Sequence, residues 1–160
     1  MLKIKIVAVG KIRENYLHTG ISKFKERLRP YVNLEEIEVT PGKTPRKVKQ
    51  SDIEKCLQQE GELILNALAK DEYCVVLDRE GKLMTSRGLA RSIQNLQKKG
   101  QSRICFIIGG AFGLDKEVIK RGDYVLSFSP LTFTHEMMRL ILLEQVYRAF
   151  KIIRGEPYHW

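Results

Sequence analysis

The segment ICFIIGGAFG occupies residues 104–113, and YVLSFSPLTFTHEMMR occupies residues 124–139. Each begins with an apolar run and continues into a turn with small residues, and a long helical pattern follows the second turn. An earlier run, YCVVLD at residues 73–78, has the same character. Nearly continuous apolar strands indicate a parallel sheet that is covered on both faces. Because the turns that follow parallel strands share one edge of the sheet, that edge is the expected ligand site.

The rest of the chain alternates between strand and helix patterns, which predicts an α/β fold with a mostly parallel sheet flanked by helices. Strands are expected at Leu2–Val9, Leu34–Val39, Tyr73–Asp78, Ile104–Gly109 and Tyr124–Phe128. Helices are expected at Asn15–Leu28, residues 51–68, Ser86–Lys99, Asp115–Lys120 and His135–Ile153. Ser51 and Glu54 form a capping-box pattern at the start of the second helix. With no repeat and no sign of a second domain, residues 1–160 are expected to form a single domain.

The composition favours an acidic partner. The 160 residues carry a net charge of +9, which is typical of nucleic-acid binding and less often of binding to an anionic membrane surface, with simple solubility as the alternative. The three cysteines lack CxxC spacing, which favours a reducing, cytoplasmic location. No apolar run approaches the roughly 18 residues of a membrane span, and no metal-ligand spacing occurs. We therefore expect neither membrane insertion nor a bound metal.

The three turns after the apolar runs, Leu77–Gly81, Gly109–Gly113 and Ser127–Thr134, are the candidate ligand site. Glycines let a ligand approach the backbone closely. Hydroxyls beside apolar side chains in the third turn suit a flat ring with polar edges, such as adenine. A tight strand-to-helix turn is the alternative explanation of the double glycine. The missing GxGxxG, Walker A and G-x-S-x-G patterns argue against NAD and other common phosphate-loop or hydrolase sites.

Two side chains open the last predicted helix. His135 directly follows the third turn, where a helix N-terminus disfavours imidazolium and leaves a neutral ring able to accept a proton. A capping or core histidine is the alternative. Arg139 lies one turn further on the same face. Its guanidinium would bind a phosphate or pair with Glu136 or another carboxylate.

The C-terminal third also predicts contacts with other molecules. The helix over His135–Ile153 is apolar on more than one stripe. This pattern predicts a homodimer with that helix at its centre, or else burial within one domain. The tail RGEPYHW, residues 154–160, combines cations with rings that stack on unpaired bases, which favours RNA binding over a frayed terminus. The basic loop at residues 43–49 is either an outer RNA contact or a solvated surface.

Several motifs occur together: VAVGK at Val7–Lys11, GK-x-x-x-S at Gly81–Ser86, F-x-IGG at Phe106–Gly110, S-F-S-x-x-TF-x-H at Ser127–His135, and EQVYRAFKI-x-RGE-x-YH at Glu144–His159. In this combination the whole chain resembles the RlmH family of SPOUT-class methyltransferases. The resemblance implies a C-terminal trefoil knot and a homodimer. It also implies methyl transfer from S-adenosylmethionine to N3 of a pseudouridine in large-subunit ribosomal RNA. A non-catalytic RNA- or ribosome-binding module of the same fold is the alternative function.

The resemblance also assigns residues. Those implied to bind S-adenosylmethionine are Leu77, Gly109, Phe128, Ser129, Pro130, Leu131, Thr132 and Phe133. Those implied to contact RNA are Arg139, Arg154, Tyr158 and His159. We nominate His135 as the base that accepts the N3 proton, with solvent hydroxide or a phosphate oxygen as the alternatives. The chain departs from the family pattern at Thr134, which replaces a usual proline and is a competent N-cap, and at Trp160, which replaces a usual basic residue.

Overall fold

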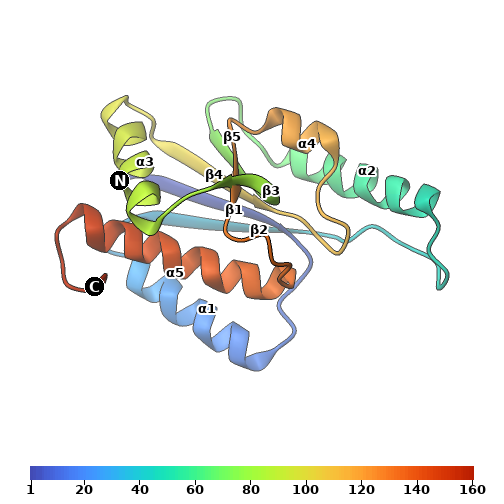
Figure 1. The fold of residues 1–160 in the computed structure, drawn as a ribbon, viewed down its shortest axis with the longest axis horizontal. Helices are drawn as coiled ribbons and strands as arrows, with labels where there is room; N and C mark the ends of the chain where they lie inside the picture. The colour runs from blue at the N-terminus through green and yellow to red at the C-terminus, as the bar shows by residue number, and fades with distance from the viewer.

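The computed structural model describes residues 1–160 and contains one five-stranded, all-parallel sheet (Figure 1). The strands are β1 (Lys3–Val9), β2 (Asn33–Val39), β3 (Tyr73–Leu83), β4 (Arg103–Ile108) and β5 (Tyr124–Ser127). Their order across the sheet is β2-β1-β4-β3-β5. The predicted α/β class and parallel sheet are confirmed, whereas the trefoil knot stays a prediction.

Helices cover both faces of this sheet (Figure 1). The helices are α1 (Asn15–Leu28), α2 (Gln50–Asn66), α3 (Ser86–Lys98), α4 (Lys116–Arg121) and α5 (His135–Ile153). α5 packs between α1 and α3 on one face, and α2 packs with α4 on the other. None of the helices combines the length and the apolar character that a membrane span requires.

Two hydrophobic cores of unequal size explain why the strand sequences are continuously apolar. The larger core has 22 buried residues and lies under α1, α3 and α5, and the smaller has 10 and lies under α2 and α4. Successive strand side chains point to opposite faces. Phe106 therefore enters the larger core, while its neighbours Cys105 and Ile107 enter the smaller one. All three cysteines are buried and unpaired.

The structure corrects two local predictions. β3 does not end at Asp78: Leu77 and Lys82 both pair with Leu126 of β5, so Asp78–Gly81 leaves the ladder as a bulge and the strand then resumes to Leu83. The capping box at Ser51 is wrong as well. α2 begins at Gln50, which puts Asp52 at the third helical position, where its carboxylate accepts a 2.9 Å hydrogen bond from the backbone N–H of Lys49.

Candidate functional site

The three predicted turns meet at the carboxyl edge of the sheet and enclose a cavity of about 870 Å³. It is lined by residues 77–80 and 108–114, by residues 126–135 except Ser127 and Pro130, and by Met138. The predicted meeting of the turns is therefore confirmed. Seven of the eight residues expected to bind the methyl donor line the cavity, namely Leu77, Gly109, Phe128, Ser129, Leu131, Thr132 and Phe133, and Pro130 does not.

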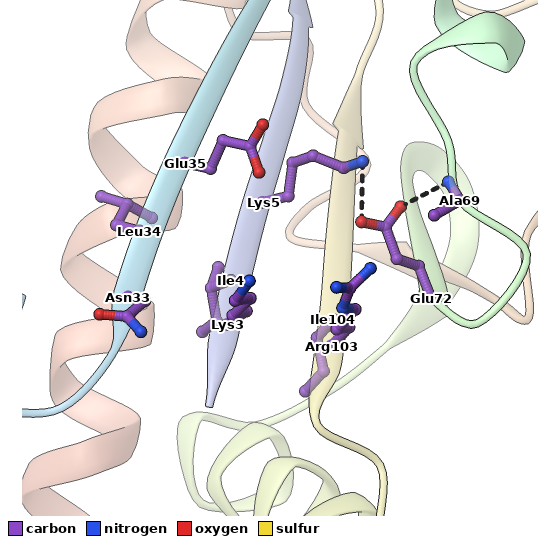
Figure 2. A pocket seen from close by; sticks show the side chains of 10 residues that line it. All are labelled: Lys3, Ile4, Lys5, Asn33, Leu34, Glu35, Ala69, Glu72, Arg103 and Ile104. Carbon is purple, nitrogen blue, oxygen red and sulfur yellow. Dashed lines mark hydrogen bonds and ion pairs between the residues drawn. The ribbon is translucent and has the colours of Figure 1, made fainter. Parts of the chain in front are cut away.

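A second cavity, of about 430 Å³, lies near the start of β1, β2 and β4 (Figure 2). Its central feature is an ion pair between Lys5 Nζ and Glu72 Oε1 at 2.7 Å. Lys5 also donates to the carbonyl of Ala69 at 2.6 Å, and Glu72 accepts the Ala69 N–H at 2.9 Å. Because these buried charges satisfy each other, this cavity is part of the scaffold, and the carboxyl-edge cavity is the candidate site.

The glycine turn after β4 forms a tightly packed wall of the candidate site. The Gly113 N–H donates to the carbonyl of Gly110 at 3.2 Å. A Cβ atom added at Gly109 would lie only 2.5 Å from the Gly113 carbonyl oxygen. The alternative of a tight turn is therefore confirmed. Gly109 and Gly110 also line the cavity, and their contact with a ligand stays a prediction.

Hydroxyl groups organise the third turn. The Ser129 hydroxyl accepts the Leu131 N–H at 3.0 Å. Thr134 caps α5 by accepting the Met137 N–H at 3.2 Å, which confirms its predicted capping role. Ser127 differs from the prediction because its hydroxyl does not line the cavity. It is buried and donates instead to the carbonyl of Arg79 at 3.0 Å, which ties β5 to the bulge in β3.

His135 occupies the first position of α5 and lines the cavity. Its ring lies against Gly10, where φ is +90° and an added Cβ atom would lie 2.9 Å from Nε2. The next residue, Glu136, accepts backbone N–H groups from Arg13 and Glu14. The Arg13 hydrogen bond is the main reason why the pKa of Glu136 is lowered. These contacts fix the start of α5 to the turn after β1, and with it the histidine ring.

Arg139 is buried and paired with carboxylates. Its guanidinium contacts Glu38 at 2.5 Å and Glu36 at 3.7 Å, both on the edge strand β2. The side chain is only 4% exposed. The alternative of a carboxylate partner is confirmed, although the partners lie on β2 rather than at Glu136. This burial argues against the direct RNA contact expected of Arg139.

The tail after α5 is folded against the protein rather than frayed. The Tyr158 hydroxyl donates to Glu144 at 3.2 Å, and His159 Nδ1 lies 3.1 Å from the Arg148 guanidinium. The Arg154 guanidinium lies 4.7 Å from the ring centre of Tyr31. The tail thus folds back along the C-terminal half of α5, where Glu144 and Arg148 lie roughly 14 and 20 Å from His135 at 1.5 Å rise per residue. Within one subunit the tail therefore does not line the cavity.

Asp78, Arg79 and Glu80 all line the cavity, as expected for the turn Leu77–Gly81, although the sequence patterns gave none of these charged side chains a ligand role of its own. The signal was present, because a DRE run directly follows a buried strand. Gly10, which supports the His135 ring, was likewise missed as part of the site. No group of three or more His, Cys, Asp or Glu side chains is arranged to hold a metal ion.

The parallel sheet and the cavity at its carboxyl edge define an α/β protein of the class that binds a ligand across strand ends. The family described as "Predicted SPOUT methyltransferase" matches residues 2–159. The chain belongs to the SPOUT methyltransferase family.

Relatives of known name cover nearly the whole chain. It is 57% identical to ribosomal RNA large subunit methyltransferase H of Halothermothrix orenii over 158 residues, 99% of both chains. The proteins of the same name from Carboxydothermus hydrogenoformans and Clostridioides difficile are each 48% identical, again over 99% of both chains. These relatives confirm the resemblance to the RlmH family.

A solved structure, described as a probable methylase family protein from Haemophilus influenzae, shares the fold at 13% identity. Its TM-score is 0.58, over 98% of this chain and 70% of that one.

Proposed function

We propose that this protein is an S-adenosylmethionine-dependent methyltransferase that modifies N3 of a pseudouridine in large-subunit ribosomal RNA. The observation that carries the proposal is the three-turn cavity in a chain of a methyltransferase family. The names of the relatives favour catalysis over the alternative of a non-catalytic ribosome-binding module. The same activity on ribosomal RNA favours a cytoplasmic location.

The cavity walls suit an adenosyl compound. Its volume of about 870 Å³ lies within the usual range of small-molecule sites. The glycine turn offers backbone groups without intervening side chains, and Leu77 and Phe128 offer apolar surface for a ring. S-adenosylmethionine would supply an electrophilic methyl group there. We propose that Leu77, Gly109 and residues 128–133 hold it, with Pro130 acting through the shape of the turn.

The chain must also remove a proton, because N3 of the target base is protonated before it is methylated. His135 is the one histidine that lines the cavity, and its ring is held against Gly10. A neutral imidazole at a helix N-terminus can accept that proton. We propose this role for His135 and expect close positioning of the two substrates to supply much of the remaining rate.

Replacing His135 by alanine is expected to reduce methyl transfer by about 10²- to 10⁴-fold, the usual contribution of a general base. The affinity for S-adenosylmethionine should change little. Single-turnover methylation measures the first quantity and calorimetry the second. His18→Ala, on the exposed surface of α1, is the matched control. Unchanged turnover in His135→Ala would remove the histidine from the mechanism.

For the RNA contacts we retain Arg154, Tyr158 and His159 and omit the buried Arg139. The net charge of +9 favours a polyanionic substrate. The tail carries two rings and a guanidinium that lie along the C-terminal half of α5. Trp160 is 97% exposed, so its indole is available to stack on a base.

We propose a homodimer formed through the outer side of α5. Met137 and Ile141 on this helix are only half-buried in the single subunit. Ile141→Lys is expected to dissociate the dimer, because a charged side chain resists burial in an apolar interface. Sedimentation equilibrium measures the mass, with Val48→Lys at an exposed site as control. A monomeric wild-type protein at micromolar concentration would contradict the proposal.

The proposed activity has a direct test. The protein is incubated with methyl-labelled S-adenosylmethionine and ribosomes from a strain that lacks the corresponding enzyme. We expect label on one pseudouridine of large-subunit RNA, located by mass spectrometry of nuclease fragments. A ribosome-binding module would bind the particles and leave the RNA unlabelled.

A further inference from the structure

The bulge in β3 places three charged residues on the wall of the cavity. Because Leu77 and Lys82 share one partner on β5, the intervening residues leave the ladder. Asp78, Arg79 and Glu80 line the cavity as a result. Together with His135 they are the only ionisable residues among the 20 that line it. The charge of this site is therefore supplied almost entirely by one short segment.

Contacts on both sides hold the bulge in place. The Ser127 hydroxyl donates to the Arg79 carbonyl at 3.0 Å, and Arg79 Nη1 donates to the Thr132 hydroxyl at 3.1 Å. Within the bulge the Glu80 N–H donates to Asp78 Oδ1 at 2.9 Å. The first and third turns of the site are thus linked through Arg79, and the three charged groups lie on a fixed backbone.

The two carboxylates have no basic partner within the protein. Neither Asp78 nor Glu80 takes part in any of the eight ion pairs. A local excess of negative charge in a protein of net charge +9 does not suit a polyanionic RNA backbone. It suits a small cationic ligand. The guanidinium of Arg79, which lines the same cavity, adds a site for a carboxylate of the same ligand.

We propose that Asp78, Arg79 and Glu80 bind the charged amino-acid end of the methyl donor and favour the cationic donor over its product. This inference rests on the proposed function. In the reaction the methyl group passes from sulfur to N3, the N3 proton leaves to a base, and the sulfur keeps the bonding electron pair. The product sulfur is therefore neutral. Two nearby carboxylates stabilise the bound donor more than the bound product.

Calorimetry with three probes tests the inference: S-adenosylmethionine, S-adenosylhomocysteine, and 5′-methylthioadenosine, which lacks the amino-acid end. The first variant is Asp78→Asn/Glu80→Gln. The side-chain oxygen of the new asparagine can still accept the hydrogen bond from the backbone N–H of residue 80, so the bulge keeps this contact. We expect a roughly three- to tenfold loss of affinity for S-adenosylmethionine, the range for exposed ion pairs. The loss for S-adenosylhomocysteine should be smaller, since it keeps the ammonium but has a neutral sulfur. Binding of 5′-methylthioadenosine, which has neither positive charge, should change by less than about twofold.

Arg79→Gln gives a second, different signature. It should lower the affinity for the two probes that carry a carboxylate and leave the affinity for 5′-methylthioadenosine unchanged. The double variant Glu54→Gln/Glu62→Gln makes the same net charge change at exposed sites on α2 outside the cavity, and it should alter no affinity.

Equal losses for all three probes, or no loss for any, would overturn the assignment. If the wild-type protein itself binds no S-adenosylmethionine, the proposed function fails instead, so the two failures are distinguishable.

Discussion

Gly109→Ala is expected to abolish detectable binding of S-adenosylmethionine. The added Cβ atom would lie 2.5 Å from the Gly113 carbonyl oxygen and 2.9 Å from Leu114 Cγ. The first of these is backbone, so the glycine turn must open to accommodate it. Because this turn forms one wall of the cavity, we expect at least a roughly 100-fold loss of affinity, equivalent to about 2.7 kcal/mol. Calorimetry on wild type and variant measures the change.

Gly100→Ala is the matched control for this experiment. Gly100 follows α3 with φ of +85° and has no neighbour within 4 Å of an added Cβ atom. Alanine there costs stability through backbone strain of about 1 kcal/mol but leaves the cavity untouched. Affinity within threefold of wild type in a folded Gly109→Ala protein would show that the turn is not part of the donor site.

Glu72→Ala is expected to lower the free energy of unfolding by about 3–5 kcal/mol, the usual cost of removing one partner from a buried ion pair. The Lys5 and Glu72 side chains are 10% and 7% exposed, and their 2.7 Å contact is visible in Figure 2. The variant leaves the Lys5 ammonium buried with only the Ala69 carbonyl as a close partner. Guanidinium denaturation at one fixed protein concentration measures the loss, because an oligomer's stability depends on concentration.

Two further variants test whether the loss of stability comes from leaving a buried charge without its partner. Asp71→Ala removes the exposed partner of Arg103, whose contact is 3.4 Å, and should cost less than about 1 kcal/mol. The double variant Lys5→Met/Glu72→Leu removes both buried charges and should recover most of the lost stability. A loss below about 1 kcal/mol in Glu72→Ala would contradict the burial argument.

The sequence predicts most of the framework because its signals are local. Runs such as YCVVLD and ICFII are apolar at every position, and such runs form strands between two covering layers. Parallel pairing then brings the turns after them to one edge, so the carboxyl-edge cavity follows from the order of the elements. Gly109 and Phe128 were placed at that cavity by the same reasoning.

What was missed depends on partners far away in the chain. The residues DREGK resemble a loop, and only pairing with β5 shows that β3 resumes at Lys82. Arg139 lies one turn from His135 and resembles a phosphate ligand, but its partner Glu38 is 101 residues away on an edge strand. The prediction of where α2 begins was wrong for another reason. Asp52 and Glu54 are both plausible capping acids, and the choice between them depends on where the preceding loop enters the helix.

The unequal cores have a consequence for motion. The layer of α2 and α4 rests on 10 buried residues and the layer of α5 on 22. The layer of α2 and α4 should therefore unfold locally at a lower free-energy cost, and its backbone amides should exchange with solvent before those of α5. The glycine turn leads into α4 and the third turn leads into α5. A ligand bound between these two turns would therefore connect the layer of α2 and α4 to the layer of α5.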